Sequence, residues 1–160
     1  MDSAPYLCEV VPEKALRQVT GFTGPLKDYT SGQWAMSGNC LMQDVTPSPL
    51  SLGWGRKDGE KVLERLHGGV FAQYNPTPLP AEMGTGSVLI HPRPPSTIDP
   101  NDVIAIFRCG DVRPWIHMSL PRVAPGRDPV KDLTDLMRIA QKRYGELHDC
   151  TPAPLGEADQ

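Results

Sequence analysis

The most reactive side chains in this sequence are those of its four cysteines, Cys8, Cys40, Cys109 and Cys150. A cysteine can attack a substrate, bind a metal, carry a lipid or form a disulfide. No two of these cysteines form a C-x-x-C pair, so the spacing typical of zinc ribbons and of thiol redox motifs is absent. Their role therefore has to be inferred from their surroundings in the chain.

Three of the four roles lack a feature that they require. Lipid attachment at Cys8 needs small residues before it and an apolar run upstream, and residues 4–7, APYL, do not fit. A nucleophilic Cys8 needs a base, which the sequence does not place beside it. A metal site needs histidines close to the cysteines, but His117 and His148 lie at no usual ligand spacing from the last two. Two disulfides are the favoured interpretation, and four buried thiols in a cytosolic protein are the alternative.

Four cysteines allow three disulfide pairings. We favour Cys8 with Cys40 and Cys109 with Cys150, because each pair then joins the segments that bracket one helix and one strand. Disulfides persist in oxidising compartments. This pairing therefore favours a protein that works outside the cytoplasm.

One expected hairpin carries the residues best suited to bind a ligand. Trp115 is flanked by Arg108 and Arg113, and His117 follows on the same expected strand. Together they could line a groove for a small ligand or a metal, although a tryptophan on a strand more often packs in the core. These four are the candidate binding residues.

No catalytic constellation is visible along the chain. The histidines are scattered, at positions 67, 91, 117 and 148. No Ser-His-Asp arrangement, pair of carboxylates with motif spacing or glycine-rich phosphate loop can be assembled from the sequence. We therefore expect neither an enzyme nor a bound cofactor or metal.

Length and composition indicate one folded domain, with 160 residues of which 39% are hydrophobic. A net charge of −3 gives no reason to expect nucleic acid as a partner. The longest apolar run, residues 103–107, is far shorter than the ~20 residues of a membrane-spanning helix. The 18 prolines predict long irregular connections, above all in the proline-rich segment 75–100.

Three segments have the apolar spacing and the end signals of helices. They are residues 9–20, 60–67 and 130–147. Gly21 is expected to end the first helix in the left-handed conformation. Asp128 and Pro129 are expected to begin the third, because aspartate favours the N-cap and proline the first helical position.

Six short segments have strand character, namely residues 33–36, 39–43, 50–54, 87–91, 102–109 and 113–120. Residues 22–32 are expected as turns, 70–74 as a strand or a loop, and 151–160 as a flexible tail. The element order α-β-β-α-(Pro-rich)-β-β-β-α predicts an α+β fold with helices packed on an antiparallel sheet. Residues 1–150 are expected to form a single disulfide-linked domain.

The N-terminal pattern resembles a known family. A cysteine precedes VPEKALRQVTGF, and SGNC and PLSLGWGR follow further along. This looks like the actinobacterial secreted lipoprotein domains of unknown function, in which a cysteine precedes a short helix that ends in glycine, and a second cysteine lies on the first strand. Cys8, Gly21 and Cys40 occupy these positions, and the resemblance covers residues 6–56. It implies a secreted or cell-surface protein with paired cysteines and no known catalytic residues.

Together these observations favour a non-enzymatic binding module, secreted or tethered to the outer face of the cell membrane, with a protein partner at the cell envelope. Residues 1–10 have no features of a signal peptide, so either the protein is cytosolic or a signal or anchor has been removed before them, and the expected disulfides favour the second alternative. The alternative is a carrier of a small ligand or a metal that uses a groove near Trp115 and His117.

Overall fold

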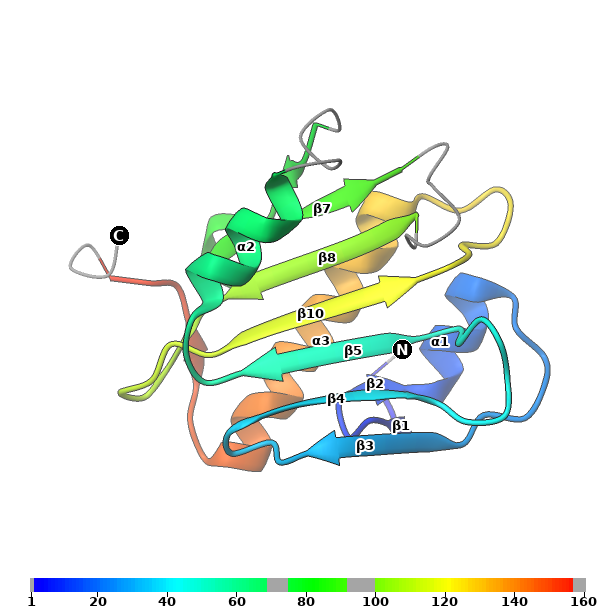
Figure 1. The fold of residues 1–160 in the computed structure, drawn as a ribbon, viewed down its shortest axis with the longest axis horizontal. Coiled ribbons are helices and arrows are strands. Elements are labelled where there is room, and N and C mark those ends of the chain that lie inside the picture. Colours follow the sequence, from blue (N-terminus) through cyan, green and yellow to red (C-terminus); the bar gives the residue numbers. More distant parts are fainter. Residues whose placement is uncertain (1, 69–74, 92–99, 157–160) are drawn as a thin grey trace.

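The computed structural model describes residues 2–68, 75–91 and 100–156, and its centre is a seven-stranded antiparallel sheet (Figure 1). The strand order is β3-β4-β5-β10-β8-β7-β6. These strands are β3 (Asp28–Gly32), β4 (Ser37–Met42), β5 (Ser51–Gly55), β6 (Thr77–Pro78), β7 (Thr85–Ile90), β8 (Asn101–Ile106) and β10 (Trp115–Leu120). An antiparallel sheet with helices packed on it confirms the predicted α+β class.

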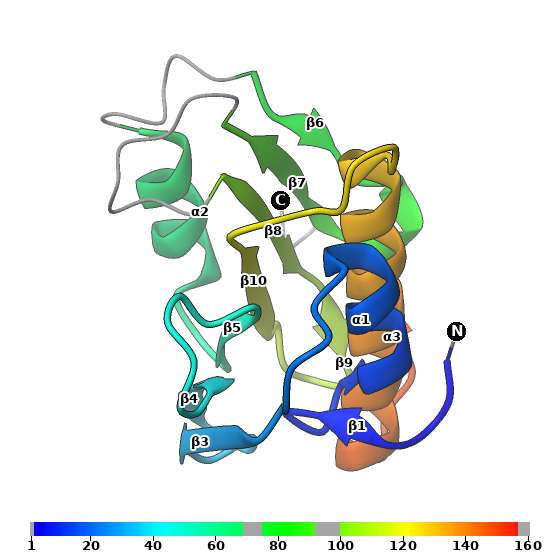
Figure 2. The same cartoon turned by 90° about the vertical axis from the view of Figure 1, so that its right-hand side faces the viewer.

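The three α-helices among the described residues cover the two faces of the sheet unequally. α1 (Glu13–Thr20) and α3 (Pro129–His148) lie on one face, and α2 (Gly59–His67) lies on the other (Figure 2). The core lies between the sheet and the pair α1 and α3, and includes Leu16, Cys40, Met42, Leu52, Trp54, Val103, Ile116, Met118, Leu133 and Met137. Alternate residues of a strand point to opposite faces. The residues between these core positions therefore point to the face that carries α2, which we call the outer face.

The long helix α3 follows the signals in its sequence closely. Oδ1 of Asp128 accepts a hydrogen bond from the backbone N–H of Lys131 at 3.2 Å, and Pro129 is the first helical residue. The helix begins and ends one residue outside the predicted 130–147. Helix α2 likewise begins one residue before the predicted 60–67.

The first helix is shorter than predicted. Residues 9–20 were expected to be helical, but α1 begins at Glu13 because β1 (Tyr6–Leu7) pairs with β2 (Val11–Pro12) just before it. Cys8, with φ 53°, turns the chain between these strands, and its N–H donates to the Asp28 carboxylate at 2.6 Å. The predicted cap at Gly21 is confirmed, with φ 73°.

The strand β3 was missed, since residues 22–32 were expected to be turns. Its residues are polar and mostly exposed, as suits an edge strand, so no alternation of hydrophobic residues marks it. Residues 33–36, expected as a strand, instead join β3 to β4. Within this connection Trp34 is buried and stacks on Trp54, with ring centroids 3.9 Å apart.

The described part of the proline-rich segment is more regular than expected. β6 pairs with β7, η2 (Ala81–Met83) forms one 3-10 turn, and β7 begins two residues before the predicted strand 87–91. The rest of that segment, 92–99, and the strand or loop expected at 70–74 lie outside the described residues.

The segment expected as a flexible tail begins with a paired strand. β11 (Pro152–Ala153) forms a two-stranded sheet with β9 (Arg108–Cys109). The disulfide between Cys109 and Cys150 brings the two strands together. The expected strand 102–109 is thus divided between β8 and β9.

Both disulfides have the favoured pairing. Cys8 and Cys40 join the turn before α1 to β4, with their Cα atoms 5.9 Å apart. Cys109 and Cys150 join β9 to the end of α3, with Cα atoms 5.4 Å apart. Two disulfides in a chain of this size indicate an oxidising environment. Among the described residues, no helix is both long enough and apolar enough to cross a membrane.

Candidate functional site

The outer face is covered at one side of the sheet and open at the other. Gly59 of α2 packs against Ile106, and the outward side chains of Ile104 and Leu89 are buried. On the far side the outward residues Tyr29 and Leu41 are 57% and 43% exposed. Exposure of the outer face therefore increases from β8 toward the edge strand β3.

We define the open half of the sheet as the outward residues of β3, β4, β5 and β10. They are Tyr29, Ser31, Ser37, Asn39, Leu41, Ser51, Gly53, Gly55, Trp115, His117 and Ser119. Register aligns them in rows across the strands, so that Tyr29, Leu41, Ser51 and Ser119 follow one another. None of these residues is an aspartate, glutamate, lysine or arginine, although 22% of the chain is charged.

Trp115 lies flat on this surface because two glycines face it from β5. A Cβ at Gly53 would lie 3.7 Å from Cζ3 of the ring, and one at Gly55 would overlap Nε1. Nε1 donates a hydrogen bond to the carbonyl of Lys57 at 2.8 Å. One ring face is therefore held against the sheet, and the side chain stays partly exposed.

Next to Trp115, β8 and β10 bring together a polar cluster around the buried Asp102. Nε2 of His117 lies 2.9 Å from Oδ1 of Asp102, and the hydroxyl of Ser119 donates to the same oxygen. Nε2 of the fully buried His91 lies 3.7 Å from the other oxygen, Oδ2. The carboxylate thus fixes the orientation of His117, which is itself partly exposed.

This cluster does not have the geometry of a nucleophilic triad. In a triad the histidine uses one ring nitrogen for the serine and the other for the carboxylate. Here Nε2 of His117 faces both, at 3.3 Å from the Ser119 hydroxyl and 2.9 Å from Asp102. The arrangement positions an imidazole on the open half of the sheet and does not activate the serine.

The potential ligand atoms around Asp102 also lie too far from one another to form a metal site. Within residues 2–68, 75–91 and 100–156, one group of at least three potential ligands lies close enough together, namely Cys8, Asp28 and Cys40. The two sulfurs of that group are bonded to each other and cannot serve as thiolate ligands. The described residues therefore offer no ready metal ligand set.

The four candidate binding residues do not line a common groove. Trp115 and His117 lie together on the open half, as proposed from the sequence. Arg113 instead pairs with Glu60 of α2 and lines a separate hollow of about 570 Å³ with residues such as Met36 and Arg56. Arg108 lies in β9, outside the main sheet. Binding by these residues stays a prediction, with Trp115 and His117 on the open half and the two arginines outside it.

Two members of the cluster, Asp102 and Ser119, were missed. The sequence carries their signal, because β8 and β10 form a hairpin in which Asp102 pairs with Ser119. Strand alternation then places His117 on the same face. To predict this contact one must know which residues of β8 and β10 pair with each other. The run of apolar residues in β8 does not reveal that register.

His67 of α2 lies on the outer face, on the side of the sheet that α2 covers. Its burial predicts that the stability of the protein depends on pH. Nε2 of His67 lies 2.7 Å from the hydroxyl of Ser87, and burial lowers the pKa of His67 below its usual 6.5. Burial also lowers the pKa of His148, at the end of α3. Because the unfolded chain binds these protons more readily, stability falls as pH drops through the usual histidine range.

We expect the free energy of unfolding to be lower at pH 5.5 than at pH 7.5, and the loss to be smaller in His67→Gln and in His148→Gln. Urea denaturation at both pH values measures this difference. The two residues lie on different elements, so their effects should add in the double variant. An identical pH dependence in the wild type and in both variants would contradict the assignment.

Comparison of the chain with protein-family models, with curated proteins and with solved structures gave no match.

Proposed function

We propose that this protein is an extracytoplasmic binding module, secreted or tethered to the outer face of a membrane, that takes a protein partner on the open half of its sheet. The observation that carries the proposal is the uncharged surface formed by β3, β4, β5 and β10, which is exposed on β3 and β4 and half-buried or buried on β5 and β10. Two disulfides support the compartment. The resemblance of residues 6–56 to actinobacterial secreted domains stays a prediction from the sequence, and it implies the same compartment.

The composition of the open half suits a protein interface. Charged residues are depleted at the centre of such interfaces, and aromatic residues are enriched. Tyrosine, serine, glycine and asparagine also dominate the binding loops of antibodies, because they combine rigid contact area with adaptable hydrogen bonds. The open half offers Tyr29 and Trp115 for contact area, with Asn39 and the serines at 31, 37 and 51 beside them.

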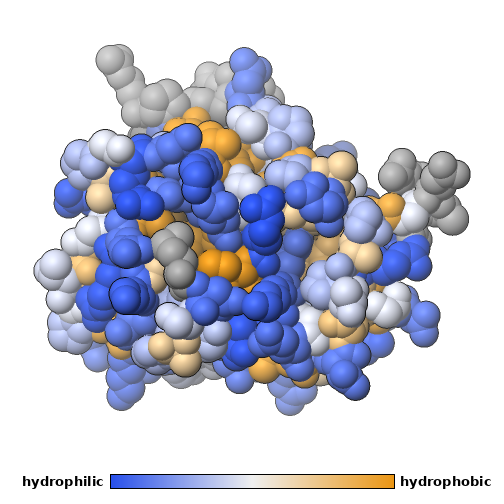
Figure 3. Space-filling model, turned by 180° about the vertical axis from the view of Figure 1, so that it is seen from behind, coloured by the Kyte–Doolittle hydropathy of each residue, from blue (hydrophilic) through white to orange (hydrophobic). Residues whose placement is uncertain are grey.

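The opposite face of the molecule has a different character. Figure 3 shows mostly hydrophilic residues over the side that α1 and α3 cover. Lys131 pairs with Asp135 and Arg143 with Glu146 along α3. Charged pairs of this kind are typical of a surface that stays in water. The contrast favours the open half over the helical face as the partner surface.

The polar cluster around Asp102 would give the open half a hydrogen-bonding group of fixed orientation. Asp102 holds His117 by Nε2 at 2.9 Å, so the imidazole is oriented before a partner arrives. Ordering a side chain in advance lowers the entropy cost of binding. His117 would then supply a directional contact within a surface that is otherwise neutral.

The test compares two exposed leucines on opposite sides of the molecule. Leu41, on the open half, is 43% exposed, and Leu147, on α3, is 39% exposed. Immobilised wild type, Leu41→Ser and Leu147→Ser are incubated with an envelope fraction of the source cells. We expect a partner that the wild type and Leu147→Ser retain equally and that Leu41→Ser retains about tenfold less, as befits the loss of a central apolar contact.

Thermal unfolding of the three proteins shows first that the substitutions leave the fold intact. Equal loss of the partner in Leu41→Ser and in Leu147→Ser contradicts the placement of the partner on the open half. Retention by all three proteins contradicts it as well.

A further inference from the structure

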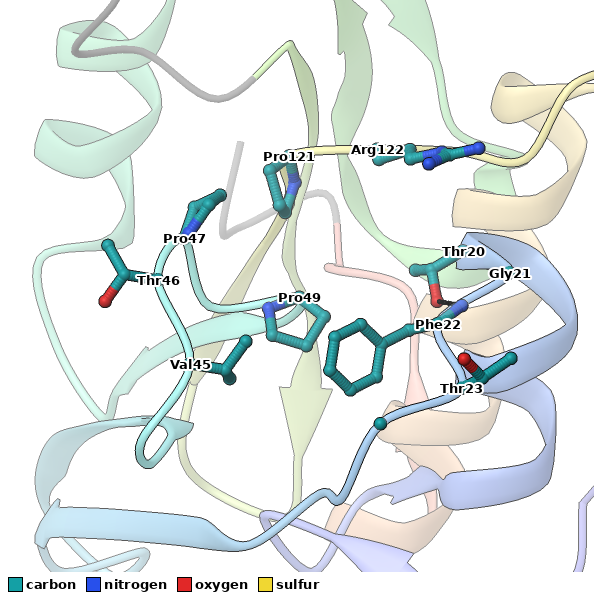
Figure 4. Close-up of a pocket in the computed structure, with 11 residues that line it drawn as sticks. Thr20, Gly21, Phe22, Thr23, Val45, Thr46, Pro47, Pro49, Pro121 and Arg122 are labelled. Atoms are coloured by element: carbon teal, nitrogen blue, oxygen red, sulfur yellow. Dashed lines mark hydrogen bonds between the residues drawn. The ribbon is translucent and has the colours of Figure 1, made fainter.

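A pocket of about 460 Å³ lies at the end of the sheet where α1 stops (Figure 4). Three segments far apart in the sequence line it, namely the end of α1 with the loop that follows, the β4–β5 connection, and the residues after β10. The lining residues are Thr20, Gly21, Phe22, Thr23, Gly24, Val45, Thr46, Pro47, Pro49, Pro121 and Arg122. Its volume falls within the range of small-molecule sites.

Four of the lining residues carry rings, namely Phe22, Pro47, Pro49 and Pro121. Figure 4 shows the Phe22 ring beside Pro49, with Pro121 pointing into the space above them. Val45 completes the apolar side, whereas the side chain of Thr46 points away. Such walls favour a compact apolar body over an extended polar one, because they offer contact area and few hydrogen bonds.

Each segment of the wall is held in place by its own hydrogen bonds. Nη1 of Arg17 donates to the carbonyl of Phe22 at 3.2 Å and to that of Gly24 at 2.8 Å. The hydroxyl of Ser48 accepts from the N–H of Met42 at 2.9 Å within the β4–β5 connection. The third segment is pinned where the N–H of Ala124 donates to the carbonyl of Val19 at 2.8 Å. The pocket is therefore largely formed before a ligand arrives.

Among the described lining residues one is charged, and its charge is positive. Arg122 lies along the upper rim in Figure 4, near Thr20 and Gly21. Among the residues that the structure describes, its guanidinium makes no hydrogen bond or ion pair, and no acidic residue lines the pocket. A guanidinium binds carboxylate, sulfonate and phosphate oxygens through paired N–H groups. The pocket thus offers apolar walls that can hold an apolar group, with a positive charge at the rim.

We infer that this pocket binds a small organic anion, an acidic group on a compact apolar body, with the body against Phe22 and the prolines and the acidic group on Arg122. The observations that carry the inference are the prearranged apolar walls and the uncompensated positive charge beside them. The site lies apart from Trp115 and His117, so the inference stands independently of the proposed function.

The probe is anilinonaphthalene sulfonate, an aromatic anion whose fluorescence rises in apolar surroundings, and its uncharged counterpart is N-phenylnaphthylamine. We expect the dissociation constant of the anionic dye to rise about tenfold in Arg122→Gln and to recover in Arg122→Lys, while the uncharged dye binds both variants equally. Arg65→Gln, an exposed substitution on α2, is the matched control and should leave both dyes unaffected. Amide NMR shifts of Thr23 and Val45 on addition of the dye locate the site.

Competition tests whether the apolar body is compact. Displacement of the dye by indole acetate supports a compact body, whereas displacement by decanoate alone indicates an extended chain and contradicts it. Displacement by neither compound overturns the inference. Equal affinity of the anionic dye for the wild type and Arg122→Gln, or shifts confined to residues outside the pocket, overturns it too.

Discussion

Replacing Cys8 and Cys40 together by alanine is expected to lower the free energy of unfolding by about 3–4 kcal/mol. The disulfide closes a loop between residues 32 apart in sequence, and removing it restores chain entropy to the unfolded state. Both cysteines are buried, so the substitution also removes packed side-chain atoms from the core. Urea denaturation followed by tryptophan fluorescence measures the change.

The second disulfide provides the matched comparison. Cys109 and Cys150 are 41 residues apart, so their paired replacement should cost about as much. The unreduced wild type should yield no thiol to an alkylating reagent, since the structure contains no free cysteine. Four alkylated thiols in the purified protein, or unchanged stability in both paired variants, would contradict the disulfides and with them the oxidising compartment.

Replacing Asp102 by alanine is expected to lower the free energy of unfolding by about 2–4 kcal/mol. The carboxylate is 6% exposed and accepts hydrogen bonds from Ser119 and His117, which lose their acceptor in the variant. A buried polar group without a partner pays the full cost of leaving water. Asp102→Asn keeps a carbonyl oxygen in place, so we expect it to lose only about 1 kcal/mol.

A double-mutant cycle separates the hydrogen bond from the rest of this effect. Ser119→Ala alone should be mildly destabilising, and its cost should shrink when Asp102 is already alanine. Binding of the partner should weaken in Asp102→Ala as well, because His117 is no longer held. Additive losses in the double variant, or an Asp102→Ala protein as stable as the wild type, would contradict the role assigned to the cluster.

The elements that were predictable have strong local signals. α3 combines an aspartate cap, a first-position proline and a regular apolar stripe. β5 alternates between apolar and small or polar residues, and β10 alternates between apolar and polar residues after Trp115. β3 has none of these signals, because an edge strand with one exposed face needs few apolar residues. The start of α1 was misplaced since the left-handed turn at Cys8 is favoured by a contact with the distant Asp28.

The sites were less predictable than the fold, because they depend on pairing between distant segments. Trp115 and His117 could be selected by residue type, but Asp102 joins them only through the register of β8 and β10. The open half could not be recognised while β3 was missing. The anion pocket draws on residues as far apart as Thr20 and Arg122, and no local pattern relates them.

Hydrogen–deuterium exchange of the protein, with and without the captured partner, measures directly whether the partner covers the open half of the sheet. We expect slower exchange of backbone amides in β3, β4 and β5 when the partner is bound, with little change in α1 and α3. Slower exchange confined to α1 and α3, with β3 and β4 unaffected, would contradict it.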